Sequence, residues 1–417
     1  MIVCLMAVSM TQNVRDRLSV EALQQSCTLH FLDIRPILGL HTTTAEDALK
    51  EESLTAMRDW AQLSRTLREL APSIVLDISS PNFLLRRIAW ESKRGRFLLI
   101  KIRDGSLPNP SFWRRMLIRV QSVTRRRSTP FIAEIATVAE TGVRFALAKS
   151  LLRDIFHLVR EFVSKRIGPK VDVELFAGLE ALKKSTHRAG LSVNIASIDL
   201  ERISASNPIA ADRLVFLDDA ISDAKDYEII GIPSPIEPSR YYPWLKAALS
   251  HLSNKFNCRV VIAIHPDNHH KVKFYKKAFP DFDCEVGQSF DLLQECKFAA
   301  FHKSTLALCA VEAKAIPISL SLPSSSDLMT RSYVEAFCRT IGADVLNFQN
   351  DSEDSTLISY EQNYRPEELA KRIREQFLGN ASMKRADLVV SAANFMSLGW
   401  PKDDVINKLR EETSGVT

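Results

Sequence analysis

The chain has 417 residues, of which 46% are hydrophobic and 25% are charged, and its formal net charge at pH 7 is +5. This composition is that of a globular protein and excludes a chain that is disordered over most of its length. Because a single hydrophobic core rarely serves more than about 250–300 residues, the length predicts two domains.

The first eight residues are apolar and predict a buried strand over 2–9 rather than an export signal. They lack a basic n-region and a small-residue cleavage site, and they are too few to span a bilayer. No later segment has about 18 uncharged apolar residues in a row. The seven cysteines are odd in number and show no Cys-x-x-Cys spacing, which indicates reduced thiols. We therefore expect a cytoplasmic protein.

The N-terminal half alternates strand-like and helix-like stretches. Further strands are predicted over 28–34, 73–78, 96–102, 130–137, 170–176 and 192–198, and helices over 13–25, 45–70, 111–122, 143–166 and 178–189. Strands that alternate with helices of this length form a parallel sheet covered on both faces. We therefore expect residues 1–206 to form one doubly wound α/β domain.

A strongly basic block lies within this domain, between Leu84 and Arg127. Its only acidic residues are Glu91 and Asp104, and aromatic residues such as Trp90 are interleaved with the basic ones. The thirteen basic residues are Arg86, Arg87, Lys93, Arg94, Arg96, Lys101, Arg103, Arg114, Arg115, Arg119, Arg125, Arg126 and Arg127. Such a block suits anionic lipid headgroups at the inner face of a membrane or an acidic acceptor, and the alternative is a solvated basic face. No nucleic-acid-binding motif accompanies it, so nucleic acid is not an expected partner.

A second unit of the same kind is predicted over 207–380. After Asn207 and Pro208, strands are predicted over 213–217, 258–264, 283–286, 298–301 and 316–319, and helices over 241–256, 270–279, 290–295, 305–313 and 366–377. The proline-rich stretch 232–238 is predicted to be a loop. The tail over 381–417 is predicted to be helical from Arg385 onward and is a candidate to pack back on the first domain.

His265 is the first candidate functional residue. Open parallel sheets bind ligands beyond the carboxyl ends of their strands, and His265 directly follows the strand predicted over 258–264. Pro266 comes next and holds His265 in an extended backbone conformation. An imidazole placed there is able to donate a hydrogen bond to a phosphate or to act as a general acid. The alternative is a histidine that caps a neighbouring loop.

Lys303, Ser304 and Thr305 follow the strand predicted over 298–301 and open the next helix. Backbone N–H groups and the helix dipole favour an anion at a helix start, and these side chains would add donors; plain helix capping is the alternative. Glu312 lies about two turns further along the helix. It is a candidate to bind ribose or sugar hydroxyls, or else to pair with Lys314 or another basic residue.

The order of these motifs resembles that of bacterial nucleotide-sugar glycosyltransferases of the GT-B class. The likeness covers roughly residues 215–320 and is nearest to enzymes of capsule and lipopolysaccharide biosynthesis, including the sialyl- and polysialyl-transferase group. In that group the histidine of a His-Pro motif and Ser/Thr residues contact the donor phosphates, and the histidine can serve as general acid. The resemblance implies these roles for His265 and for Ser304 and Thr305. It also implies two Rossmann-like domains that face a cleft.

Asp218, Asp219 and Ala220 resemble in part the acidic motif of the same group, in which two acidic residues precede a glycine and a carboxylate acts as base. Here alanine replaces the glycine, and the pair lies in the C-terminal domain, whereas the family's motif lies much further upstream. We expect Asp218 and Asp219 to lie in the loop after the second domain's first strand, with a donor or acceptor role. Asp199, after the strand predicted over 192–198, is an equal candidate, so the catalytic base stays unassigned.

Together these features predict a glycosyltransferase that moves a sugar from a nucleotide-sugar donor to a surface-polysaccharide or lipid-linked glycan acceptor. The C-terminal domain would hold the nucleotide, and the N-terminal domain the acceptor. His269 and His270 have no carboxylate or cysteine partner at metal-binding spacing, and no Gly-rich nucleotide loop occurs, so neither a metal nor a cofactor is expected. The alternatives are a nucleotide-sugar epimerase on the same fold and a non-catalytic relative that binds a glycan.

Overall fold

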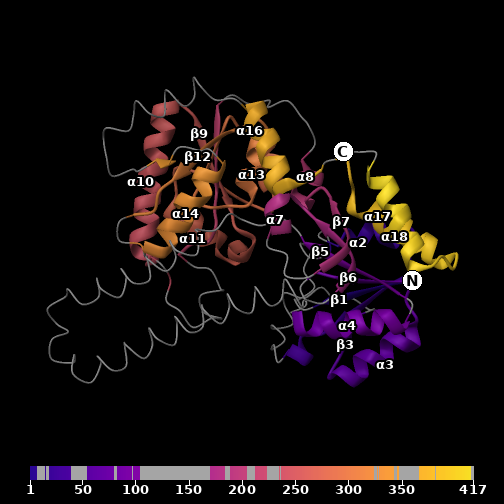
Figure 1. The fold of residues 1–417 in the computed structure, drawn as a ribbon. Coiled ribbons are helices and arrows are strands. Elements are labelled where there is room, and N and C mark those ends of the chain that lie inside the picture. The colour runs from indigo at the N-terminus through magenta and orange to yellow at the C-terminus, as the bar shows by residue number, and fades with distance from the viewer. Residues whose placement is uncertain are drawn as a thin grey trace, which may run out of the picture. The chain divides into compact units, whose positions relative to one another are not determined.

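The computed structural model describes most of the chain. The described residues are 1–6, 15, 18–38, 54–78, 82–95, 97–103, 170–183, 188–203, 212–222, 234, 236–323, 326, 328–341, 345–346, 366–380 and 382–414. They form two compact units, many of whose elements are labelled in Figure 1. The first unit contains the described residues up to Ile198 together with those from Glu375 onward, and the second contains those from Asp199 to Arg374.

Among the described residues, the first unit is built on a parallel sheet with the strand order β3-β2-β1-β4-β5-β6-β7. Its strands are β1 (Ile2–Met6), β2 (Leu29–Asp33), β3 (Leu54–Ala56), β4 (Ile74–Asp77), β5 (Leu98–Arg103), β6 (Lys170–Phe176) and β7 (Arg188–Asn194). Successive side chains of β1 point to opposite faces, because Ile2 and Cys4 belong to one core cluster and Val3 and Leu5 to another. The sheet therefore has a hydrophobic core on each face.

Helices cover both faces of this sheet. They are α2 (Val20–Gln24), the short turn η1 (Pro36–Leu38), α3 (Trp60–Leu70), α4 (Asn82–Gly95), α7 (Leu179–Lys183), α17 (Arg385–Ser397) and α18 (Lys402–Ser414). Buried side chains of α3 and α4 form the core on one face, and those of α2, α17 and α18 form the core on the other. In Figure 1, α3 and α4 accordingly lie across the strands of this unit from α17 and α18.

The two last helices of the chain thus belong to the core of the first unit. Val389 of α17 and Val405 and Leu409 of α18 are buried in the same cluster as alternate residues of β1. The chain approaches this position through Gly379, whose φ is +82° and where a Cβ atom would lie 1.8 Å from the backbone oxygen of Ile195. Only glycine fits a left-handed backbone at such a close approach.

The second unit is built on a parallel sheet with the strand order β10-β9-β8-β11-β12-β13 among the described residues. Its strands are β8 (Arg213–Leu217), β9 (Arg259–Ile264), β10 (Asp283–Val286), β11 (Phe298–Phe301), β12 (Ile316–Leu320) and β13 (Val345–Leu346). Its helices are α10 (Pro238–Phe256), the turn η3 (Pro266–Lys271), α11 (Val272–Ala278), α12 (Ser289–Gln294), α13 (Leu306–Glu312), α14 (Leu328–Ile341) and α16 (Pro366–Ile373). The π-helical turn η5 (Arg374–Leu378) follows α16. The two units are therefore two doubly wound α/β domains, which confirms the predicted fold class.

The structure corrects three predicted elements. The helix predicted over 45–70 is wrong over Leu54–Ala56, which form β3, because the side chain of Asp59 accepts a hydrogen bond from the backbone N–H of Gln62 and caps α3 only there. The helix predicted over 178–189 ends at Lys183. The strand predicted over 192–198 lies earlier, as β7, where it pairs with β6, and Ile198–Arg202 form the short helix α8 instead.

Other predictions lie outside the described residues: the strand over 130–137, the helices over 111–122 and 143–166, and the basic residues beyond Arg103. Among the residues that the structure describes, no helix is both long enough and apolar enough to cross a bilayer.

Candidate functional site

The strand order of the second unit reverses direction between β8 and β11. In open parallel sheets, ligands bind outside the carboxyl ends of the strands at such a switch point. The residues that follow β8, β9 and β11 are Asp218, His265 and His302 respectively, so the predicted site segments lie at this edge of the sheet. The three strands are buried along nearly their whole length, which fixes where these segments begin.

Asp218 is a buried anchor that joins the segments after β8 and β9. Its Oδ2 atom accepts a hydrogen bond from the backbone N–H of His265 (3.2 Å) and another from the hydroxyl of Tyr275 (2.6 Å). Its Oδ1 atom accepts from the backbone N–H of Ala220 (3.0 Å). Burial and the neighbouring Asp218 charge raise the pKa of Tyr275, so its phenol stays protonated and donates. The Asn268 amide in turn donates to the Tyr275 oxygen (3.0 Å).

Asp219 joins the segment after β8 to the segment after β11. Its Oδ2 atom accepts a hydrogen bond from the backbone N–H of Lys303 (2.7 Å). Its Oδ1 atom is buried and has no hydrogen-bond partner among the described residues. Burial raises the pKa of Asp219 to about 7, and the charge of Asp218 acts in the same direction, whereas the contact with Lys303 opposes the shift. This carboxyl group therefore titrates near neutral pH.

The two carboxylates thus share one task. Each accepts a backbone N–H from a different segment that the sequence singles out, Asp218 from the His265 segment and Asp219 from the Lys303 segment. They position these segments next to the end of β8. The sequence predicted a direct donor or acceptor role for the pair. It did not predict the positioning contacts, because their donors are backbone N–H groups, which the residue type does not distinguish.

Ala220 completes this turn in an unusual backbone conformation. Its φ is +52°, in the left-handed region that favours glycine, and its side chain is buried. This is the position at which the resembled acidic motif carries glycine. The backbone conformation is therefore the one that glycine would adopt, although the residue is alanine.

His265 is half-buried at the end of β9, and Pro266 begins the turn η3 directly after it. The backbone carbonyl of His265 accepts a hydrogen bond from the N–H of Asn268 (2.8 Å), so both backbone groups of His265 are held. His269 and His270 are exposed in the same turn, and Nδ1 of His269 contacts the carbonyl oxygen of Pro266. Among the described residues, no group of three His, Cys, Asp or Glu side chains is arranged to hold a metal ion.

Lys303, Ser304 and Thr305 connect β11 to α13. Lys303 and Ser304 are half-buried and Thr305 is exposed. Thr305 occupies the N-cap position of α13, but its side chain makes no capping hydrogen bond. The capping alternative therefore finds no support at Thr305. The Lys303 ammonium lies 6.0 Å from the centre of the Tyr333 ring.

His302 is a residue whose role sequence reasoning missed. It is fully buried, Nδ1 contacts the carbonyl oxygen of Leu320 (2.8 Å), and Nε2 contacts the hydroxyl of Tyr241 (3.1 Å). Burial lowers the pKa of His302 to about 4, so the neutral ring donates from Nδ1 and accepts at Nε2. It is stacked on Trp244 as well. His302 therefore fixes the end of β11 against β12 and α10.

Glu312 is engaged in an ion pair, and Asp199 lies in a short helix. Both Glu312 carboxylate oxygens accept from Nε of Arg374 (2.7 and 2.8 Å), which favours the ion-pair alternative, with Arg374 as the partner that the structure shows. Glu312 ends α13, about 10 Å along the helix axis from Thr305 at 1.5 Å per residue. Asp199 lies in the first turn of α8 rather than directly after a strand.

An Asp-x-Asp sequence, Asp281 to Asp283, also escaped the sequence analysis. Asp281 pairs with Lys246 (2.8 Å) and Asp283 with Arg259 (2.5 Å). Asp283 begins β10, so it lies at the amino edge of the sheet, opposite the switch-point loops. These contacts are surface ion pairs.

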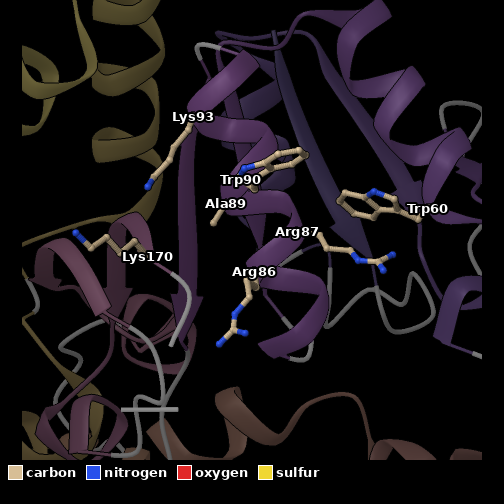
Figure 2. A pocket seen from close by; sticks show the side chains of 7 residues that line it. All are labelled: Trp60, Arg86, Arg87, Ala89, Trp90, Lys93 and Lys170. Atoms are coloured by element: carbon tan, nitrogen blue, oxygen red, sulfur yellow. The ribbon is translucent and has the colours of Figure 1, made fainter. Parts of the chain in front are cut away.

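The described part of the basic block divides into two groups. Lys101 and Arg103 point inward and pair with Asp77 and Glu174, so they do not belong to a basic surface. Three exposed cations of α4, those of Arg86, Arg87 and Lys93, line a hollow of about 700 Å³, shown in Figure 2, whereas the Arg94 guanidinium lies over the Trp90 ring. Its lining residues are Trp60, Arg86, Arg87, Ala89, Trp90, Lys93 and Lys170.

Comparisons with known proteins found similarity in solved structures only. No family model matches the chain, and no curated protein matches it. The chain is similar to MurG from Acinetobacter baumannii, with a TM-score of 0.40, 11% identity and coverage of 98% of this chain and 99% of that one. It is similar to a UDP-GlcNAc 2-epimerase from Methanocaldococcus jannaschii, with a TM-score of 0.44, 9% identity and coverage of 95% and 99%. It is also similar to the wall teichoic acid polymerase TagF, with a TM-score of 0.46, 8% identity and coverage of 99% and 89%.

Proposed function

We propose that the protein is a glycosyltransferase that binds a nucleotide-sugar donor at the switch point of its second unit and transfers the sugar to a glycan acceptor held by its first unit. One observation carries the proposal. Asp218 and Asp219 hold the His265 segment and the Lys303 segment beside each other, at the edge where open parallel sheets bind their ligands.

The side chains of these segments suit a phosphate group. In the proposal, His265 donates to a donor phosphate oxygen, Ser304 and Thr305 contribute hydroxyl donors, and the Lys303 ammonium adds positive charge. Negative charge grows on the leaving phosphate as the bond to the sugar breaks. Fixed donors that face this charge stabilise the transition state more than the ground state, which is the condition for catalysis.

His265 is the proposed general acid. It follows a buried strand, and both of its backbone groups are hydrogen-bonded, so its ring starts from a defined position. His302 is unsuited to this role because it is buried, neutral and engaged at both ring nitrogens. Asp218 and Asp219 are proposed as positioning residues for the donor loops.

Calorimetric titration with UDP, GDP, CDP, CMP and dTDP tests the donor site. We expect one of these nucleotides to bind the wild-type chain, and we expect His265→Ala and Ser304→Ala each to weaken binding about tenfold or more, as removal of a charge-assisted hydrogen bond does. His269→Ala is the matched control, because it removes an exposed histidine of the adjacent turn and should leave the affinity unchanged.

Failure of all five nucleotides to bind the wild-type chain would overturn the donor site. Once the base is known, the corresponding nucleotide sugars are incubated with the protein without any acceptor. An epimerised nucleotide sugar as product would replace transfer by the epimerase alternative. Activity that persists in EDTA would support the metal-independent chemistry that the proposal assumes.

A further inference from the structure

The hollow on the first unit combines positive charge with aromatic rings. Trp60 begins α3, five of the lining residues come from α4, and Lys170 begins β6. In Figure 2 the Trp60 and Trp90 rings lie on one side of α4 together with the Arg87 side chain, whereas Lys93 and Lys170 lie on the other side and Arg86 extends away from the rings. The volume, about 700 Å³, is that of a small-ligand pocket.

The helix α4 produces this hollow because its two faces differ. Leu84, Leu85 and Ile88 are buried in the core of the first unit. At helical spacing, the opposite face then carries Arg86, Arg87, Trp90 and Lys93. Trp90 is 53% exposed, which is unusual for a tryptophan and marks a surface that suits contact with a ligand or partner.

All the charged residues among the described lining residues of the hollow are basic. Two carboxylates of the first unit, those of Glu91 and Asp172, are engaged with groups outside the hollow's lining. Glu91 is buried and accepts hydrogen bonds from Ser64 (2.7 Å) and Arg68 (3.3 Å). Asp172 accepts from the backbone N–H of Leu99 (2.8 Å) and from Lys402 (3.3 Å). The hollow therefore favours an anion.

The hollow extends away from the carboxyl edge of the sheet. Lys170 is the first residue of β6 and Phe176 the last, so about 20 Å separates them at 3.3 Å per residue. Lys93 lies in the last turn of α4, at the same amino edge as Lys170. An anion held by these two lysines is far from the edge where substrates of parallel sheets react. The amino-edge end of the hollow is therefore accessory to the reaction.

We propose that this hollow is an accessory binding site for a phosphate-bearing saccharide chain, the acidic form of the glycan acceptor in the proposed function, on which this inference rests. The guanidinium groups of Arg86 and Arg87 can each donate two parallel hydrogen bonds to phosphate oxygens. Indole rings such as that of Trp90 offer apolar area and a polar N–H to a sugar ring. The cations of the hollow come from α4 and from the start of β6, so they surround a concave site. A protein that binds a membrane surface presents one flat face to it instead.

The experiment compares phosphomannan oligosaccharides with neutral mannan oligosaccharides of equal length, by calorimetry at low salt. We expect the phosphorylated chain alone to bind, with an affinity that falls as salt is added. Arg86→Ala combined with Arg87→Ala should weaken binding at least about tenfold, and Trp90→Ala should weaken it about fivefold. Lys93→Glu combined with Lys170→Glu should abolish binding, because it reverses the charge at the amino edge.

The matched control is Arg65→Ala combined with Lys277→Ala, which removes the same charge from exposed helix positions outside the hollow and should leave phosphomannan affinity unchanged. Equal loss in this control would show that only net charge matters and would overturn the site. Binding of neither oligosaccharide would overturn it too. So would preferential binding to vesicles of phosphatidylglycerol and phosphatidylcholine, or to single-stranded RNA, because each would assign the hollow another occupant.

Nucleotide titration of the same variants separates the two proposals. The hollow variants should bind the donor nucleotide as the wild-type chain does, which also shows that they are folded. Loss of phosphomannan binding with nucleotide binding retained concerns the hollow alone. If the wild-type chain binds phosphomannan but no nucleotide, the accessory site is supported and the donor site is refuted.

Discussion

The two units share a topology but neutralise the carboxylates at their strand ends in different ways. In the first unit, Asp77 at the end of β4 pairs with the Lys101 side chain, and Asp33 at the end of β2 pairs with Arg35. In the second unit, Asp218 and Asp219 accept backbone N–H groups instead. Because the donors are backbone N–H groups, the His265 and Lys303 side chains take no part in these two hydrogen bonds. The same fold thus holds a closed set of ion pairs in one unit and a set of positioned side chains in the other.

The largest effect is expected from breaking the buried pair of the first unit. Lys101→Met leaves the fully buried Asp77 without its cation and should lower the free energy of unfolding by about 3–5 kcal/mol. Urea denaturation measures this loss. Arg213→Ala, which breaks an exposed pair with Glu295, is the control and should cost less than about 1 kcal/mol. A loss for Lys101→Met as small as the control's would show that the pair does not secure the first unit.

A smaller effect on stability, but a loss of function, is expected at the end of β8 in the second unit. Asp218→Ala leaves the buried Tyr275 hydroxyl without its acceptor and should cost about 2–3 kcal/mol. It also frees the His265 backbone, so nucleotide affinity should fall about tenfold in calorimetry. Tyr275→Phe removes the hydroxyl but keeps the contact between Asp218 and the His265 backbone, and should retain most of the affinity. Unchanged affinity in Asp218→Ala would contradict the positioning role.

The stability of the second unit should depend on pH through Asp219. Its folded-state pKa, about 7, lies above the ordinary value of 3.8, so the folded state retains a proton that the unfolded chain releases. This group therefore contributes less stability as pH rises from about 4 through 7. The loss between pH 5 and pH 8 should be about 2–3 kcal/mol and should be absent in Asp219→Asn. Urea denaturation of both proteins at the two pH values measures it, and equal pH dependence in both would refute the assignment.

The smallest effect is expected at Ala220. Ala220→Gly relieves the left-handed backbone but increases the freedom of the unfolded chain, and these terms oppose each other within about 1 kcal/mol. Thermal unfolding should change little, and nucleotide affinity should stay the same. A destabilisation well beyond that range would mean that the buried methyl group of Ala220 packs in a way that the turn requires.

Sequence patterns predicted the strands of the second unit closely and the helices of the first unit poorly. The runs over Arg213–Leu217 and Phe298–Phe301 are short and mostly apolar, and they form strands with the predicted bounds, as does Asp283–Val286. The run before Trp60 is also apolar, but pairing with β2 makes part of it a strand, and such non-local pairing is not encoded in local spacing. The sequence did not predict α4, because its many basic residues obscure the helical spacing of its apolar residues.

The candidate site shows the same limit. The positions of His265 and Ser304 after strands are readable from sequence, because a strand end sets where a loop begins. The contacts of Asp218 and Asp219 with backbone N–H groups, and the burial of His302, depend on which strands are neighbours in the sheet. That order appears only in the folded chain.

The position of α17 and α18 has a consequence for biosynthesis. The core of the first unit needs side chains such as Val389 and Leu409, which leave the ribosome long after β7 does. At about 5–20 residues per second, the delay is about 10–40 s. All described residues of the second unit emerge during that interval. The nascent chain is therefore expected to complete its second unit first, while one face of the first unit's sheet is covered, among the described helices, by α2 alone until α17 and α18 emerge.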